Sequence, residues 1–170
     1  GVYILLEACE ILKQKQLAFQ CIFAGGVGDI DKQQFESKVQ ELQLDDCVRY
    51  VGEKFGNDKG DIFSNVDVFV HPTLNDCFPL VLLEAMQYSL PVISTLEGGI
   101  PDIVDDNSTG FLIPKNDRQA LVEKLELLIG DKDLRLKMGL AARQKFDLEF
   151  KSDTFETRMT QILHQTLKDS

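Results

Sequence analysis

Residues 66–95 read VDVFVHPTLNDCFPLVLLEAMQYSLPVIST, and this stretch decides the fold. It opens on an apolar run at 66–70, crosses a polar loop to Pro79, and closes on a second apolar run at 90–94. Short apolar runs bounded by turn-forming residues predict buried strands. Pro79 suits the first position of a helix, so we expect a helix between the two runs. The stretch therefore predicts a strand, a helix and a second, parallel strand.

The same alternation continues on both sides of this unit. Apolar runs predict further strands at 18–24, 48–51 and 110–113, and apolar residues at helical spacing predict helices between them. The predicted helices cover residues 2–13, about 31–43, 58–64, 99–105, 117–129, 132–145 and about 148–168. Alternating strands and helices are typical of a Rossmann-like, doubly wound α/β fold with a parallel sheet. Ligands bind beyond the carboxyl ends of such strands, which directs attention to the loops after residues 24, 51, 70 and 94.

Composition narrows the classes of partner. The 170 residues carry a formal net charge of −10, so nucleic acid is an unfavourable partner. No apolar run is long enough to span a membrane, and the N-terminal residues predict no signal peptide. The four cysteines lie far apart, which argues against a zinc site or a disulfide framework and fits a reducing cytosol. These cysteines are Cys9, Cys21, Cys47 and Cys77.

The helix after Pro79 offers a candidate anion site. The first N–H groups of a helix lack partners within it, so those of Leu80, Val81 and Leu82 are expected to face an anion such as a diphosphate. Glu84 stands among apolar residues, so we expect its carboxylate to be buried. A buried carboxylate needs partners, and a ribose diol would supply them. Asp76, in the preceding loop, fits local capping and sugar binding equally well.

The run from Asp76 to Glu84 resembles the acidic-x7-Glu motif of retaining GT-B glycosyltransferases, of the kind called glycosyl transferases group 1 (family 4). The segments PVIST, GGIPDIV, TGFLIP and LRLKMGLAARQKF resemble that family in order and spacing. The similarity covers nearly the whole chain, to about Phe146. It implies the C-terminal half of a GT-B fold, and transfer of a sugar from a UDP- or GDP-linked donor.

The resemblance also implies residue roles. Glu84 would hold the ribose, and Asp76 would bind hydroxyls of the donor sugar. Asp76-Cys77 stands where the family usually has Glu-Gly, which shortens the reach of the carboxylate by one methylene. No metal or cofactor is implied, because helix N–H groups and cations upstream of this chain would handle the phosphates. The other implied contacts are backbone of Cys77, Phe78 and Pro79 around the sugar, N–H groups of Leu80 and Val81 on the phosphates, Arg49 and Tyr50 beside the nucleobase, and the loop glycines Gly25 and Gly26.

The resemblance sets expectations about the whole protein as well. Residues 1–146 would form the nucleotide-sugar-binding domain, and the helix in 147–170 would cross to an N-terminal domain that binds a glycan or lipid-linked acceptor. We expect the first strand of the sheet to be lacking, and this chain alone to be inactive. The edges of the strands at 18–24 and 66–70 would then meet, be filled by another chain, or lose order. A bacterial polysaccharide pathway, in the cytoplasm or at the inner face of the membrane, is the expected setting.

Two other functions stay open on the sequence. A GT-B-fold epimerase acting on a UDP-sugar shares the architecture. A non-catalytic α/β module that binds a nucleotide or a protein partner would also account for the fold, and the change to Asp76 favours it.

Overall fold

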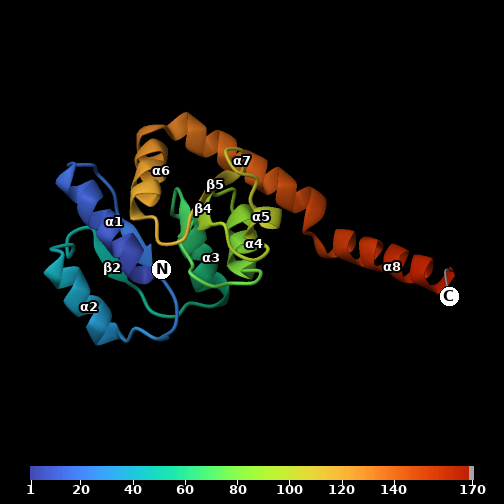
Figure 1. Ribbon diagram of the computed structural model, residues 1–170, viewed down its shortest axis with the longest axis horizontal. Coiled ribbons are helices and arrows are strands. Elements are labelled where there is room, and N and C mark those ends of the chain that lie inside the picture. The colour runs from blue at the N-terminus through green and yellow to red at the C-terminus, as the bar shows by residue number, and fades with distance from the viewer. Residues whose placement is uncertain (169–170) are drawn as a thin grey trace.

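The computed structural model describes residues 1–168, in which helices and strands alternate (Figure 1). The helices and strands, in chain order, are α1 (Val2–Gln14), β1 (Cys21–Phe23), α2 (Lys32–Glu41), β2 (Val48–Tyr50), α3 (Gly56–Ser64), β3 (Phe69–His71), α4 (Leu80–Gln87), β4 (Val92–Thr95), α5 (Ile100–Ile103), β5 (Gly110–Ile113), α6 (Arg118–Gly130), α7 (Lys132–Glu149) and α8 (Ser152–Lys168). Every helix and strand predicted from the sequence is present, with bounds that differ by a few residues.

All strand pairs are parallel, as the alternating pattern predicts, but they form two sheets instead of one. The first joins β1 to β2, with Cys21 opposite Val48. The second has the order β3-β4-β5, with Val92 of β4 opposite Phe69 on one side and Gly110 on the other. A side chain at Gly110 would overlap the backbone of Val92, so glycine allows the two strands to pair closely.

The strand β4 separates two hydrophobic cores. All four of its residues are buried, as expected for a central strand of a parallel sheet. Val92 belongs to a cluster that includes Leu82 of α4, and Ile93 belongs to the cluster that includes Leu6 and Leu121. Because successive side chains of a strand point to opposite faces, the clusters lie on the two faces of the sheet. The doubly wound α/β class is therefore confirmed.

A cavity of about 1090 Å3 lies between the two sheets. Residues 18–24, which contain β1, and residues 66–73, which contain β3, line it together with Leu5 and Leu12 of α1. In residues 1–168 no ladder joins β1 to β3, so of the three alternatives for these edges the first, that they meet, is wrong. The helices α1 and α6 pack together on one side of the molecule and hold the two sheets in place (Figure 1).

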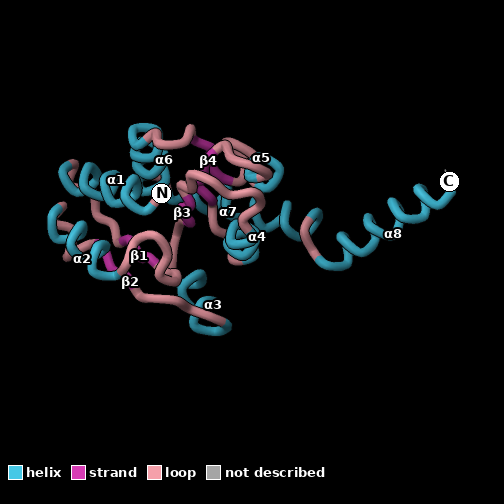
Figure 2. Tube along the Cα trace, turned by 60° about the horizontal axis from the view of Figure 1, so that its bottom comes forward, coloured by secondary structure: helices cyan, strands magenta, loops and turns pink. Residues whose placement is uncertain are grey.

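The helix α8 projects away from the rest of the molecule in both views (Figures 1 and 2). Its apolar side chains are exposed. That this helix crosses to another domain stays a prediction. Within residues 1–168 no helix combines the length and apolar character needed to cross a bilayer. The exposed apolar residues of α8 are Phe155, Met159, Ile162, Leu163 and Leu167.

Candidate active site

The loop from 72 to 79 connects β3 to α4 at the carboxyl edge of the sheet, and two buried hydroxyls hold its start. Ser94 donates a hydrogen bond of 2.8 Å to the backbone oxygen of His71. Thr95 donates one of 2.9 Å to the backbone oxygen of Thr73. Both donors are almost fully buried at the end of β4, where a hydroxyl requires a partner. The polar pair in the sequence IST therefore fixes the loop that carries Asp76.

Two glycines support the other side of this loop. Gly98 has a φ of 48°, which favours glycine, and a Cβ atom there would lie 2.3 Å from the backbone oxygen of Asp76. The N–H of Gly99 donates a hydrogen bond of 2.7 Å to the backbone oxygen of Cys77. Sequence reasoning did not assign a role to either glycine. The Gly-Gly pair that follows the strand ending at Thr95 was the sequence feature that could have indicated a close approach of two loops.

Asp76 lies beside His71. The His71 Nε2 atom is 3.4 Å from an Asp76 carboxylate oxygen, and both side chains are about 30% exposed. Burial lowers the pKa of His71 below its ordinary value, although the hydrogen bond to Asp76 opposes this shift. At neutral pH the ring is therefore neutral, and its N–H donates a long hydrogen bond when the proton is on Nε2. His71 orients Asp76 but leaves much of its carboxylate accessible.

The start of α4 differs from the sequence prediction in one respect. Pro79 is the N-cap and not the first helical residue. The N–H of Leu82 donates to the backbone oxygen of Pro79 at 3.1 Å, so the prediction that it faces an anion is wrong. No side chain caps this helix in the part of the chain that the structure describes. The N–H groups of Leu80 and Val81 therefore remain to bind an anion.

Glu84 does not have the predicted environment. Its side chain is 39% exposed, and Lys59 of α3 donates to its Oε2 atom at 2.5 Å. The prediction of a buried, unpaired carboxylate is therefore wrong. The periodicity of α4 could not show that α3 packs against it or that Leu80, one turn earlier, is 66% exposed. An accessible carboxylate is nevertheless better placed to receive a ligand than a buried one.

The loops after β1 and β2 lie together. The Tyr50 hydroxyl donates a 2.7 Å hydrogen bond to the backbone oxygen of Gly25, and the Gly25 N–H donates to Gly52 at 3.1 Å. A Cβ atom on Gly26 would lie 3.3 Å from a carboxylate oxygen of Glu53. Arg49, on β2, is exposed and lines the large cavity. The predicted residues Gly25, Gly26 and Tyr50 therefore form one group.

The large cavity lies next to this group, because Ala24, which precedes Gly25, lines it. Its lining includes Arg49 from β2, Lys59 from α3, His71 and Thr73 from the end of β3, and Val81 from α4. Of the predicted site residues, Arg49 and Val81 line this cavity, whereas Asp76, Glu84 and Tyr50 do not. The cavity extends along β1 and β3, and Asp76 lies on the loop after β3, at the carboxyl edge where open α/β sheets bind their ligands.

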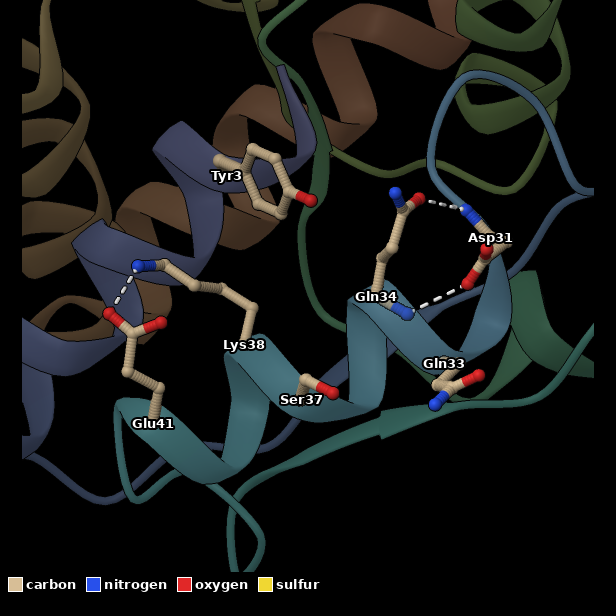
Figure 3. Close-up of a pocket in the computed structure, with 7 residues that line it drawn as sticks. All are labelled: Tyr3, Asp31, Gln33, Gln34, Ser37, Lys38 and Glu41. Carbon is tan, nitrogen blue, oxygen red and sulfur yellow. Dashed lines mark hydrogen bonds and ion pairs between the residues drawn. The ribbon is translucent and has the colours of Figure 1, made fainter.

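A second hollow lies between α1 and α2 (Figure 3). It has a volume of about 380 Å3 and contains none of the predicted site residues. Its polar groups largely bond to one another, as Asp31 and Gln34 do in a capping box. Figure 3 shows Tyr3 facing these α2 side chains. The full lining is Tyr3, Asp31, Gln33, Gln34, Ser37, Lys38 and Glu41. Among residues 1–168, no group of three or more His, Cys, Asp or Glu side chains could hold a metal ion.

Known proteins resemble this chain over most of its length. The family model described as glycosyl transferases group 1 matches residues 1–145. The amylovoran biosynthesis glycosyltransferase AmsK of Erwinia amylovora is 33% identical over 172 residues, which cover 97% of this chain and 42% of AmsK. The chain therefore spans about two fifths of that relative.

Solved structures agree on the fold. Sucrose-phosphate synthase from Thermosynechococcus elongatus superposes with a TM-score of 0.85 at 27% identity, and the match covers 100% of this chain and 43% of that one. The Anabaena protein Alr3699/HepE, solved in complex with UDP and glucose, superposes with a TM-score of 0.83 at 20% identity. That match covers 97% of this chain and 45% of the other. This chain belongs to the glycosyl transferases group 1 family.

Proposed function

We propose that this chain binds the nucleotide-sugar donor of a retaining glycosyltransferase at the carboxyl edge of its sheet. The observation that carries the proposal is the position of Asp76 and Glu84 on either side of the start of α4. Glu84 would accept hydrogen bonds from the ribose hydroxyls, and Asp76 would bind hydroxyls of the donor sugar. The N–H groups of Leu80 and Val81, between them, would receive the diphosphate.

The order of these groups along the chain matches the order of groups in the donor. A nucleotide sugar presents its sugar, diphosphate, ribose and base in that sequence. The site presents a loop carboxylate, free N–H groups, and a helical carboxylate one turn further on. Arg49, which lines the cavity, and its neighbour Tyr50 would flank the base. Backbone of Cys77, Phe78 and Pro79 would line the sugar pocket.

We propose that the nucleoside of the donor is uridine. Support comes from the Anabaena protein of the same fold, whose structure contains UDP. A GDP-linked donor is the other nucleotide that the family resemblance implies, and the experiment below separates them. No metal is required in this proposal, because the helix N–H groups and cations elsewhere in the protein balance the diphosphate charge.

The acceptor is proposed to be a glycan or a glycolipid in polysaccharide synthesis, as the name of the Erwinia relative indicates for that protein. The C1–O bond to the diphosphate would break, and the acceptor oxygen would bond to C1 on the same face of the sugar. The acceptor would bind to parts of the protein outside these 170 residues, against which α8 would pack. Four free cysteines fit a cytoplasmic reaction.

Calorimetric titration of UDP, GDP and ADP into the full-length protein tests the proposal. We expect UDP to bind, and Glu84→Gln to weaken it about 10- to 100-fold, because hydrogen bonds to a charged group are lost. Glu123→Gln, on an exposed face of α6, is the matched control and should bind UDP normally. Equal binding by the Glu84→Gln variant and the wild-type protein would disprove the proposed site.

A further inference from the structure

The geometry points to Lys59 as the residue that positions Glu84 for the ribose, an inference that rests on the proposed function. Nothing in the sequence pattern marks this lysine. Its ammonium nitrogen lies 2.5 Å from Oε2 of Glu84, and the two side chains are 38% and 39% exposed. Lys59 also lines the large cavity, as Arg49 does. A nucleotide with its ribose on Glu84 and its base near Arg49 would therefore pass Lys59.

The contact between α3 and α4 fixes the place of the lysine. Phe63, one turn after Lys59, stacks on Tyr88, one turn after Glu84, with ring centroids 5.3 Å apart. The Lys59 ammonium also lies 6.0 Å from the Phe63 ring centroid. Two residues of α3 thus meet two residues of α4 in matching register, since residues four apart share a helix face. Phe63 is buried where it stacks on Tyr88, whereas the ion pair of Lys59 and Glu84 is partly exposed to solvent.

Gly60 allows this close contact. A Cβ atom there would lie 2.7 Å from the Tyr88 hydroxyl oxygen. Glycine inside a helix costs about 1 kcal/mol relative to alanine, so its presence in α3 agrees with a requirement for close packing. Gly60 therefore leaves room for the Tyr88 hydroxyl beside the helix that carries Lys59.

The ion pair can hold Glu84 without blocking it. A carboxylate has about four acceptor positions, and the ammonium uses one of them on Oε2. The remaining positions can accept the two ribose hydroxyls. Without Lys59, a side chain that is 39% exposed would sample several rotamers and lose entropy on binding. Lys59 is thus a positioning residue that acts through Glu84, and its removal should weaken ribose recognition.

A thermodynamic cycle tests this role. UDP and its 2′,3′-dideoxy analogue are titrated into the wild-type protein and the Lys59→Met, Glu84→Gln and doubly substituted variants. We expect Lys59→Met to weaken UDP about three- to tenfold. The loss should vanish with the dideoxy analogue and in the Glu84→Gln background. Lys59→Arg should restore most of the affinity, and Lys32→Met, which removes another ion-paired surface lysine, should change nothing.

The outcomes separate the two claims. If Glu84→Gln leaves UDP binding unchanged, the proposed function itself fails. If Glu84→Gln weakens UDP but Lys59→Met does not, only the role of Lys59 is wrong. An equal loss for UDP and the dideoxy analogue would also overturn it, because the lysine would then act on the phosphates by charge. Lys59→Gln, compared by thermal unfolding, provides a second folded variant if Lys59→Met is unstable.

Discussion

Gly98 lies directly against the backbone of Asp76: a Cβ atom at residue 98 would be 2.3 Å from the Asp76 carbonyl oxygen. The loop after β4 therefore forms the support for the loop after β3. Because the carboxyl ends of parallel strands meet at one edge of the sheet, residues 22 positions apart in the sequence build one surface there. The placement of the proposed sugar-binding carboxylate thus depends on a residue with no side chain.

The first prediction concerns this support. Gly98→Ala should lower the free energy of unfolding by about 1–3 kcal/mol, because it combines a positive φ with a backbone overlap. Displacing Asp76 should also weaken UDP-sugar binding more than UDP binding. Urea denaturation and calorimetry measure the two effects. Gly130→Ala, at a glycine of α6 with open space around it, should be neutral or stabilising. Equal behaviour of both variants would contradict the account.

The second prediction separates the sugar from the nucleotide. Asp76→Asn should lower kcat/KM for sugar transfer by about 10- to 100-fold, since a charged acceptor to a sugar hydroxyl is lost. The affinity for UDP should stay within about twofold of the wild-type value. Steady-state kinetics and calorimetry give the two numbers, with Asp102→Asn, at an exposed position of α5, as the control. A comparable loss of UDP affinity would show that Asp76 does not act on the sugar.

The third prediction concerns pH. Burial lowers the pKa of His71 below its ordinary value of about 6.5, so the unfolded state binds more protons than the folded state as the pH falls. The stability from the neutral ring is complete above that value and is lost as the pH falls below it. His71→Gln should therefore flatten the fall in unfolding free energy between about pH 7 and pH 5.

The other histidine, His164, provides the control for this measurement. It lies on exposed α8, far along the chain from His71, and His164→Gln is the matched substitution. Urea denaturation at several pH values gives the slopes. A His71→Gln variant with the wild-type slope would show that this ring does not titrate as described.

The fourth prediction tests the connection between the loops after β1 and β2. Tyr50→Phe removes the 2.7 Å hydrogen bond to Gly25, which should cost about 1 kcal/mol of stability. Hydrogen exchange of the amides in 24–28 should become faster, because the loop loses one of its two ties to the region after β2. Tyr3→Phe, at the hollow of Figure 3, should leave that exchange unchanged.

Local pattern was sufficient for the elements and for the place of Asp76 in the fold. The apolar runs at 66–70 and 90–94 contain most of β3 and most of β4, and the loop between them carries Asp76 at the predicted edge of the sheet. The strand bounds were less accurate: the run at 18–24 contains only Cys21–Phe23 as strand. The apolar residues of that run outside the strand are unpaired and line the cavity between the sheets. An apolar run therefore does not by itself give the length of a strand.

Contacts between elements explain what the sequence could not predict. The environment of Glu84 depends on α3, which is distant in the sequence. Lys59, the residue of α3 that contacts Glu84, is not part of any recognisable motif. The N–H of Leu82 is used by Pro79 because the helix begins one residue later than the proline suggested. The support by Gly98 arises from the approach of two loops. Each of these features depends on packing distance, which periodicity does not encode.

The structure of the protein in complex with UDP tests the central claim most directly. The account predicts that both ribose hydroxyls lie within hydrogen-bond distance of the Glu84 carboxylate, and that the diphosphate accepts from the N–H groups of Leu80 and Val81. UDP bound in the hollow between α1 and α2, or elsewhere with Glu84 still facing only Lys59, would contradict it.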